Sequence, residues 1–268
     1  MKRIIKVAAF ALCCIVLSGC ACEHEWKDAT CTEPKTCTKC GEIEGEPLNE
    51  EDFYKSLSTG LENRWKLTLA DEGNDFVSEE DWSNYFNAEY DEISKFADAN
   101  FNNSEIADLA KHYVEVIEQS KKCLPYLNTD FWESKYVNGV YHDRAETLYK
   151  INSIKPIIVT EEFQSTLQNI LTEGEVINVV KDMIDNVQFE LVSDEYGWKT
   201  YQAIVENTSP VDFNQFWFNI DLIDEDGVTL ETISAYVDKW DVGEKTKFTF
   251  NTDEEFVTLS VEYANWYY

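Results

Sequence analysis

The sequence has 268 residues, of which 52 are Asp or Glu and 22 are Lys or Arg, giving a formal net charge of −30 at pH 7. Such a chain is repelled by nucleic acid and by anionic lipid headgroups, so we expect no nucleic-acid partner. The charge does not predict disorder, because 44% of the residues are hydrophobic and 14% are aromatic, which is ample for a packed core. The length predicts two folded units.

The first nineteen residues have the pattern of an export signal. Three basic residues among the first six are followed by an apolar run over residues 7–17, which is too short to span a bilayer because spanning needs about 20 residues. The run ends in Leu17-Ser18-Gly19-Cys20, which resembles the lipobox of bacterial lipoproteins. The resemblance implies removal of residues 1–19, attachment of lipid to Cys20, and a position on the extracytoplasmic face of the cell membrane.

A cysteine-rich head is expected over residues 20–48. Cys37-Thr38-Lys39-Cys40-Gly41 places two thiols at the spacing that clamps one Zn²⁺, and the glycine allows the tight turn after the second thiol. A closed structural site needs four ligands, and His24 and Cys31 are the best candidates for the other two. Such a site would be inert, because a filled tetrahedron leaves no position for water.

The pattern of the head resembles the small zinc-ribbon-like repeats that follow signal peptides in surface proteins of Gram-positive bacteria. The matching residues are His24-x-Trp26, Ala29-Thr30-Cys31, Pro34, Cys37-x-x-Cys40-Gly41 and Gly45. The repeats often end in a Gly-His pair, which this chain lacks, so the expected ligands are His24, Cys31, Cys37 and Cys40, with Cys22 as the alternative fourth ligand. The competing hypothesis is a pair of disulfides, which an exported protein could form.

Residues 50–186 predict an antiparallel bundle of α-helices. Phe53, Leu57, Leu61 and Trp65 recur at every fourth position and give a first helix one apolar face. Further helix starts are indicated by Ser78-x-x-Asp81, Ser104, Asp130-x-x-Glu133 and Thr160. Short connections between amphipathic helices favour the antiparallel arrangement.

Residues 187–268 change to a period of two, with short alternating segments such as Phe216-x-Phe218-x-Ile220-x-Leu222 between turn signals. This pattern predicts an immunoglobulin-like β-sandwich. The stretch Ile220-Asp221-Leu222-Ile223-Asp224 resembles the motif of the FxLYD domain, a small extracytoplasmic β-sandwich family, with Ile220 in place of the motif's Phe and Ile223 in place of its Tyr. The family has no established catalytic residues, so the resemblance assigns none here.

The sequence as a whole predicts a multi-domain α+β lipoprotein that is not an enzyme. We expect it to act as a binding or scaffold module for an envelope or extracellular partner, which is either a protein or another component of the envelope, and to be attached to the membrane through lipid on Cys20. His112 and His142 fall where exposed helix faces are expected, and no nucleophile and base converge. Two alternatives are a surface hydrolase that uses a pair of its many carboxylates, and a transporter-associated solute-binding lipoprotein.

Overall fold

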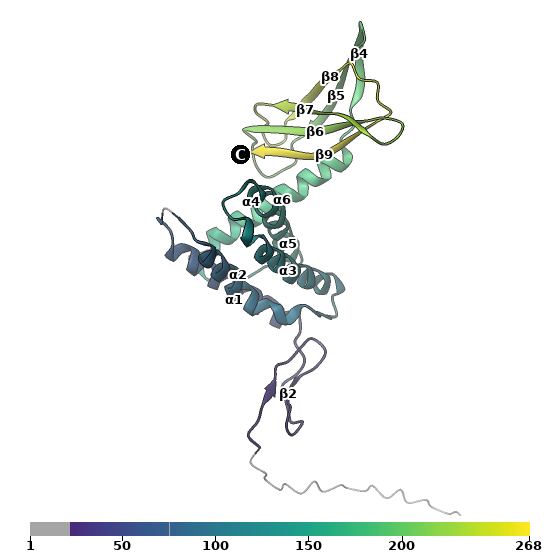
Figure 1. Ribbon diagram of the computed structural model, residues 1–268. Coiled ribbons are helices and arrows are strands. Elements are labelled where there is room, and N and C mark those ends of the chain that lie inside the picture. Colours follow the sequence, from purple (N-terminus) through teal and green to yellow (C-terminus); the bar gives the residue numbers. More distant parts are fainter. Residues whose placement is uncertain (1–21, 75) are drawn as a thin grey trace, which may run out of the picture.

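The computed structural model describes residues 22–74 and 76–268, so the predicted signal peptide and Cys20 lie outside the described residues. The described chain is a mixed α+β protein with three small antiparallel sheets. Figure 1 shows a head (residues 22–48), a helical unit (residues 49–186) and a β unit (residues 187–268) following one another along the molecule. No helix in the described residues is both long and apolar enough to cross a membrane.

The head is a sheet of three very short strands in the order β1-β2-β3. They are β1 (Trp26–Lys27), β2 (Lys35–Cys37) and β3 (Ile43–Glu44). Only two residues of the head are buried, and both are cysteines, Cys31 and Cys37. The head therefore has no apolar core of its own.

The helical unit contains the helices that the sequence pattern predicts. In chain order they are α1 (Glu50–Ala70), α2 (Glu79–Ile93), α3 (Ser104–Cys123), α4 (Asp130–Trp132), the π-helix η3 (Glu133–Tyr141), α5 (His142–Ile154) and α6 (Gln164–Asn186), with single 3-10 turns η1 (Ser94–Phe96), η2 (Leu124–Tyr126) and η4 (Glu161–Phe163). Asn49 and Ser78 form capping boxes with Asp52 and Asp81, which fix where α1 and α2 begin. The predicted fourth helix is continuous from α4 to α5, but its middle is a π-helix, which the sequence pattern does not reveal.

The β unit consists of two three-stranded antiparallel sheets with orders β4-β5-β8 and β7-β6-β9. The strands are β4 (Glu190–Glu195), β5 (Trp198–Glu206), β6 (Gln215–Ile223), β7 (Thr229–Val237), β8 (Lys245–Thr252) and β9 (Thr258–Tyr267). Alternate residues of β6, from Phe216 to Leu222, are fully buried and share one core with Phe248 and Phe250 of β8. The predicted alternation of β6 therefore marks its buried face.

Helix α6 belongs to both cores. Leu167, Ile170 and Leu171 in its first half are part of the core of the helical unit. Val176, Val180 and Met183 in its second half are part of the core of the β unit. Between them lies Gly174, where a Cβ atom would come within 2.1 Å of the carbonyl oxygen of Ala145, so α5 and α6 cross at closest approach there.

Candidate metal centre

Four potential metal ligands converge in the head. The thiols of Cys22, Cys37 and Cys40 and the imidazole of His24 have ligand atoms within 4.8 Å of one another. A tetrahedral Zn²⁺ with bonds of about 2.0–2.3 Å would separate its ligands by roughly 3.5–3.8 Å, so the group needs only a slight contraction to hold one. The distance of 3.5 Å between Cys40 Sγ and His24 Nδ1 already fits.

The hairpin between β2 and β3 places two of the thiols. Cys37 ends β2, its carbonyl accepts from Gly41 N at 2.9 Å, and its own amide donates to Glu42 O at 2.8 Å. Gly41 has φ +75°, a conformation that favours glycine, and this turn brings Cys40 back beside Cys37. Trp26 of β1 pairs with Cys37 of β2, so the residues just before β1 lie next to this turn.

His24 is oriented from both sides of its ring. Nδ1 faces Cys40 Sγ, while Nε2 lies 3.4 Å from a carboxylate oxygen of Glu42. The ring stacks on Trp26 with centroids 5.1 Å apart. A carboxylate on the far nitrogen of a ligand histidine fixes its tautomer and raises its basicity, as in many metal sites. His24 is therefore held with Nδ1 as the ligand atom.

The thiols of the group differ in acidity. Desolvation opposes ionisation of Cys37, but the backbone amides of Cys40 and Lys39 outweigh it, and the pKa of Cys37 falls from 9.0 to about 6. Desolvation, together with the neighbouring Cys40 and Cys37, raises the pKa of Cys22 from 9.0 to about 12. The backbone thus favours the thiolate of Cys37 at neutral pH, the form that binds a metal.

The structure corrects one predicted ligand. It brings His24, Cys37 and Cys40 together but places Cys31 elsewhere, and Cys22, the alternative, takes the fourth position. Cys31 packs into the core of the helical unit, with its Sγ 4.0 Å from the carbonyl oxygen of Lys95. The cause is the turn at Thr30, whose hydroxyl accepts from the amides of Thr32 and Glu33 and so turns Cys31 toward the helices.

The competing hypothesis of disulfides is not supported, because none of the described cysteines forms a disulfide. Cys22, Cys31, Cys37, Cys40 and Cys123 are all unpaired. Cys123 ends α3 and is buried as a small apolar side chain, as the sequence pattern favours.

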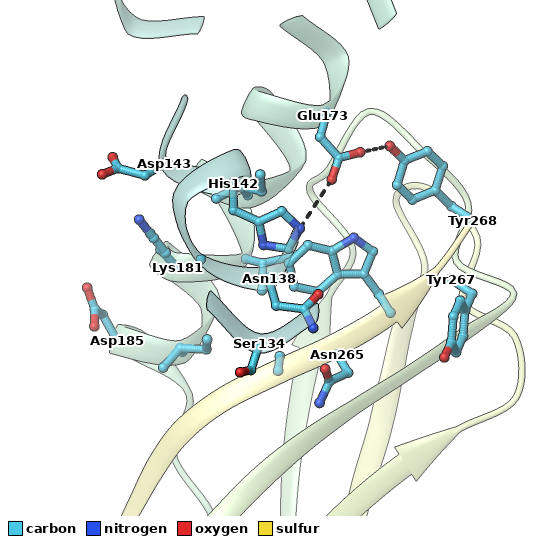
Figure 2. A pocket seen from close by; sticks show the side chains of 16 residues that line it. Ser134, Asn138, His142, Asp143, Glu173, Lys181, Asp185, Asn265, Tyr267 and Tyr268 are labelled. Atoms are coloured by element: carbon cyan, nitrogen blue, oxygen red, sulfur yellow. Dashed lines mark hydrogen bonds and ion pairs between the residues drawn. The ribbon is translucent and has the colours of Figure 1, made fainter. Parts of the chain in front are cut away.

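A second polar site lies between the helical and β units (Figure 2). It is a pocket of about 1060 Å³ lined by η3, α5, α6 and β9. His142 stacks on Trp266 with centroids 5.8 Å apart, and its Nε2 lies 3.7 Å from Glu173, which also accepts from the Tyr268 hydroxyl. Burial lowers the pKa of His142. We expected His142 to lie on an exposed helix face. That expectation is corrected, because Trp266 of β9 packs on the histidine ring.

Comparisons with known proteins identify no relative. No protein-family model and no curated protein matches the chain. A crystal structure of Campylobacter jejuni cj0090 is similar at 15% identity, over 28% of this chain and 79% of that one, with a TM-score of 0.22. A DNA-bound alkylpurine DNA glycosylase AlkC of Pseudomonas fluorescens is similar at 11% identity, over 72% and 67%, with a TM-score of 0.17. At these TM-scores neither similarity indicates a shared fold or function.

Proposed function

We propose that the protein is a non-enzymatic lipoprotein, held on the extracytoplasmic face of the cell membrane by lipid on Cys20, that binds an envelope or extracellular protein. The observation that carries this proposal is the spacing of the lipobox and the metal centre. One residue separates Cys20 from Cys22, the first residue of the metal-ligating group. A folded module would therefore begin almost at the lipid, as suits a rigid anchor.

The metal in this proposal is a structural Zn²⁺. Three thiols and one imidazole are soft ligands that suit zinc, and four protein ligands leave no position at which water could be activated. The head buries only two residues, both cysteines, so apolar burial cannot fold it. In such small modules the free energy of metal binding is the free energy of folding.

We also propose that the β unit is an immunoglobulin-like sandwich of the FxLYD kind. The FxLYD-like stretch from Ile220 to Asp224 covers the end of β6, and Ile220 and Leu222 point into the core shared by the two sheets. A rigid sandwich of this kind carries its function on its surface, which favours a binding role.

Four exposed apolar side chains on the β4–β5 hairpin support protein binding. The distal patch, as we call it, consists of Leu191, Val192, Tyr196 and Trp198, with exposed fractions of 51%, 53%, 103% and 57%. The hairpin lies at the end of the molecule opposite the head (Figure 1). Apolar patches that include tyrosine and tryptophan are typical of protein interfaces. An anchored head would present this patch away from the membrane.

The anchor is tested by replacing Cys20. Cys20→Ala should abolish incorporation of radiolabelled palmitate and release the protein from the membrane fraction. Cys123→Ala, which changes a buried cysteine of α3, is the matched control and should keep both label and location. Palmitate label in the Cys20→Ala chain would show that the anchor is assigned to the wrong residue.

The partner-binding role is tested by cross-linking on intact cells followed by mass spectrometry. The double variant Tyr196→Ser with Trp198→Ser should lose the cross-linked partner that the unaltered chain captures. A control that changes Val228 and Val257 to serine also removes two exposed apolar side chains, but outside the patch, and should keep the partner. If the Tyr196→Ser, Trp198→Ser variant captured the partner as well as the control does, the distal patch would be excluded as the binding surface.

A further inference from the structure

The core of the helical unit contains a buried cluster of charged side chains. Glu89 of α2 is fully buried, and Arg64 of α1 and Arg144 of α5 are 6% and 2% exposed. Arg64 Nη1 donates to Glu89 Oε2 at 2.8 Å, and Arg144 Nη2 donates to both carboxylate oxygens at 3.0 and 3.1 Å. Two guanidinium groups thus share one carboxylate.

The cluster carries an excess positive charge. Tyr113 donates its hydroxyl to Glu89, and burial followed by the nearby carboxylate raises the pKa of this phenol well above 10, so it stays neutral. The hydroxyl of Tyr136 accepts from Arg64 Nη2 at 3.0 Å. A buried net charge of +1 is costly because it is removed from water, unless an anion accompanies it.

The two arginines also have donors to spare. Their recorded hydrogen bonds use Nη1 and Nη2 of Arg64 and Nε and Nη2 of Arg144. These hydrogen bonds do not involve Nε of Arg64 or Nη1 of Arg144. Both side chains line a cavity of about 470 Å³ between α1, α5 and α6. Two buried arginines, which carry N–H groups beyond those bonded to Glu89 and Tyr136, therefore line a space that a small molecule can fill.

We propose that this arginine cavity binds a small organic carboxylate. A carboxylate would neutralise the excess charge and accept charge-assisted hydrogen bonds from both guanidinium groups. Trp65, Tyr141 and Ile170 supply apolar walls for the body of the ligand, and Thr166 and Asn169 supply polar contacts. The volume lies within the range of small-molecule sites, about 300–1,000 Å³. This inference does not depend on the lipid anchor or on the distal patch.

Glu173 is a negatively charged residue on the wall of the cavity. Its charge determines whether replacing it should strengthen or weaken the binding of a ligand. Figure 2 shows its two carboxylate oxygens turned toward Tyr268 and His142, on the side of the neighbouring pocket. Its carboxylate is thus engaged by Tyr268 and His142, and its negative charge repels an anion. Removing that charge should tighten the binding of a carboxylate and weaken the binding of a cation or a zwitterion.

The proposal is tested by isothermal titration of the full chain with matched acids and amides at pH 7.5. Benzoate and hexanoate are the probes, and benzamide and hexanamide have the same shape without the charge. We expect at least one acid to bind about tenfold or more tightly than its amide, because charge-assisted hydrogen bonds are roughly twice as strong as neutral ones. Equal binding of acids and amides, or no binding of either acid, would overturn the proposal.

Two variants, with one control, test whether the acid binds in the arginine cavity, and none of them changes Arg64, Glu89 or Arg144. Thr166→Trp fills the cavity and should weaken acid binding by about tenfold or more, whereas Ser165→Trp, on an exposed neighbouring position of α6, should leave binding unchanged. Glu173→Gln should tighten acid binding, and this also tests the site should Thr166→Trp fail to fold. Unchanged binding in Thr166→Trp, or weaker binding in Glu173→Gln, would place the acid elsewhere.

Discussion

The head and the β unit are both small antiparallel β structures, but they differ in what could stabilise them. The head buries only the side chains of Cys31 and Cys37, and it brings together a group of four potential metal ligands. The two sheets of the β unit enclose an aromatic core around Phe218, Phe248 and Trp240, which are fully buried. Apolar burial can thus account for the β unit but not for the head, for which we propose a metal, and the following predictions separate the two.

The largest effect is expected at the metal centre. Cys22→Ser should abolish stoichiometric zinc binding, while Cys31→Ser should leave it intact, because only Cys22 belongs to the ligand group. Structural zinc contributes about 10–16 kcal/mol to the folding of comparable peptides. Zinc content by elemental analysis of the two variants measures the difference. Zinc lost from Cys31→Ser but kept in Cys22→Ser would contradict the geometry described above.

A chelator should affect the head alone. Removing the metal should expose the head amides to rapid hydrogen exchange and leave the exchange of α1 and β6 unchanged, because their cores contain no metal ligand. Faster exchange throughout the molecule would show that the body also depends on the metal and would break the comparison.

The β unit should respond to loss of apolar volume. Trp240→Ala removes a fully buried ring that packs on Phe213, Phe216 and Phe248, and should destabilise the protein by about 3–5 kcal/mol. Trp198→Ala, at a tryptophan that is 57% exposed, is the matched control and should change stability by about 0.5 kcal/mol or less. Urea unfolding of both variants measures the difference, and equal midpoints would refute the assigned core.

The helical unit should respond to loss of charge rather than volume. Glu89→Gln keeps the shape of the side chain but leaves two buried guanidinium groups without a carboxylate, and should cost about 3 kcal/mol. Asp91→Asn, at an exposed position of the same helix, serves as the control for charge and should be nearly neutral. The same urea experiment applies, and a neutral Glu89→Gln would mean that another group balances the arginines.

The smallest effect is a pH dependence at His142. Because burial lowers its folded-state pKa below 6.5, the unfolded chain binds more protons as the pH falls through about 6.5. His142 should thus make the protein less stable toward acid, with the loss complete below the folded-state pKa. The difference in thermal midpoint between the natural chain and His142→Gln, followed from pH 7.5 to 5, isolates this residue. A difference that is independent of pH would contradict the expectation.

Local patterns predicted much of the fold. The capping box of Ser78 and Asp81 and the alternation from Phe216 to Leu222 act over a few residues, so the sequence reveals them directly. The prediction that Cys31 is one of the four metal ligands was wrong, because the direction of its side chain depends on the turn at Thr30 and on contact with the helices. Cys22 carried the same chemical signal and differed only in position.

The arginine cluster could not be found from the sequence. Arg64, Glu89 and Arg144 lie 25 and 55 residues apart and meet only when α1, α2 and α5 pack together. Glu89 is one of 52 acidic residues, and nothing adjacent to it in the chain marks it as buried. The contact of His142 with Trp266 joins residues that are even farther apart in the sequence and depends on how the β unit meets the helices.

Helix α6 has a mechanical consequence. Its 23 residues form a rod roughly 34 Å long that is embedded in both cores, and residues 187–189 alone separate its end from β4. A pull on the distal patch, opposed by an anchor at the head, would load this rod rather than a flexible linker. The helical and β units would then resist tension as one body, so the head, which lacks an apolar core, is the part expected to yield first.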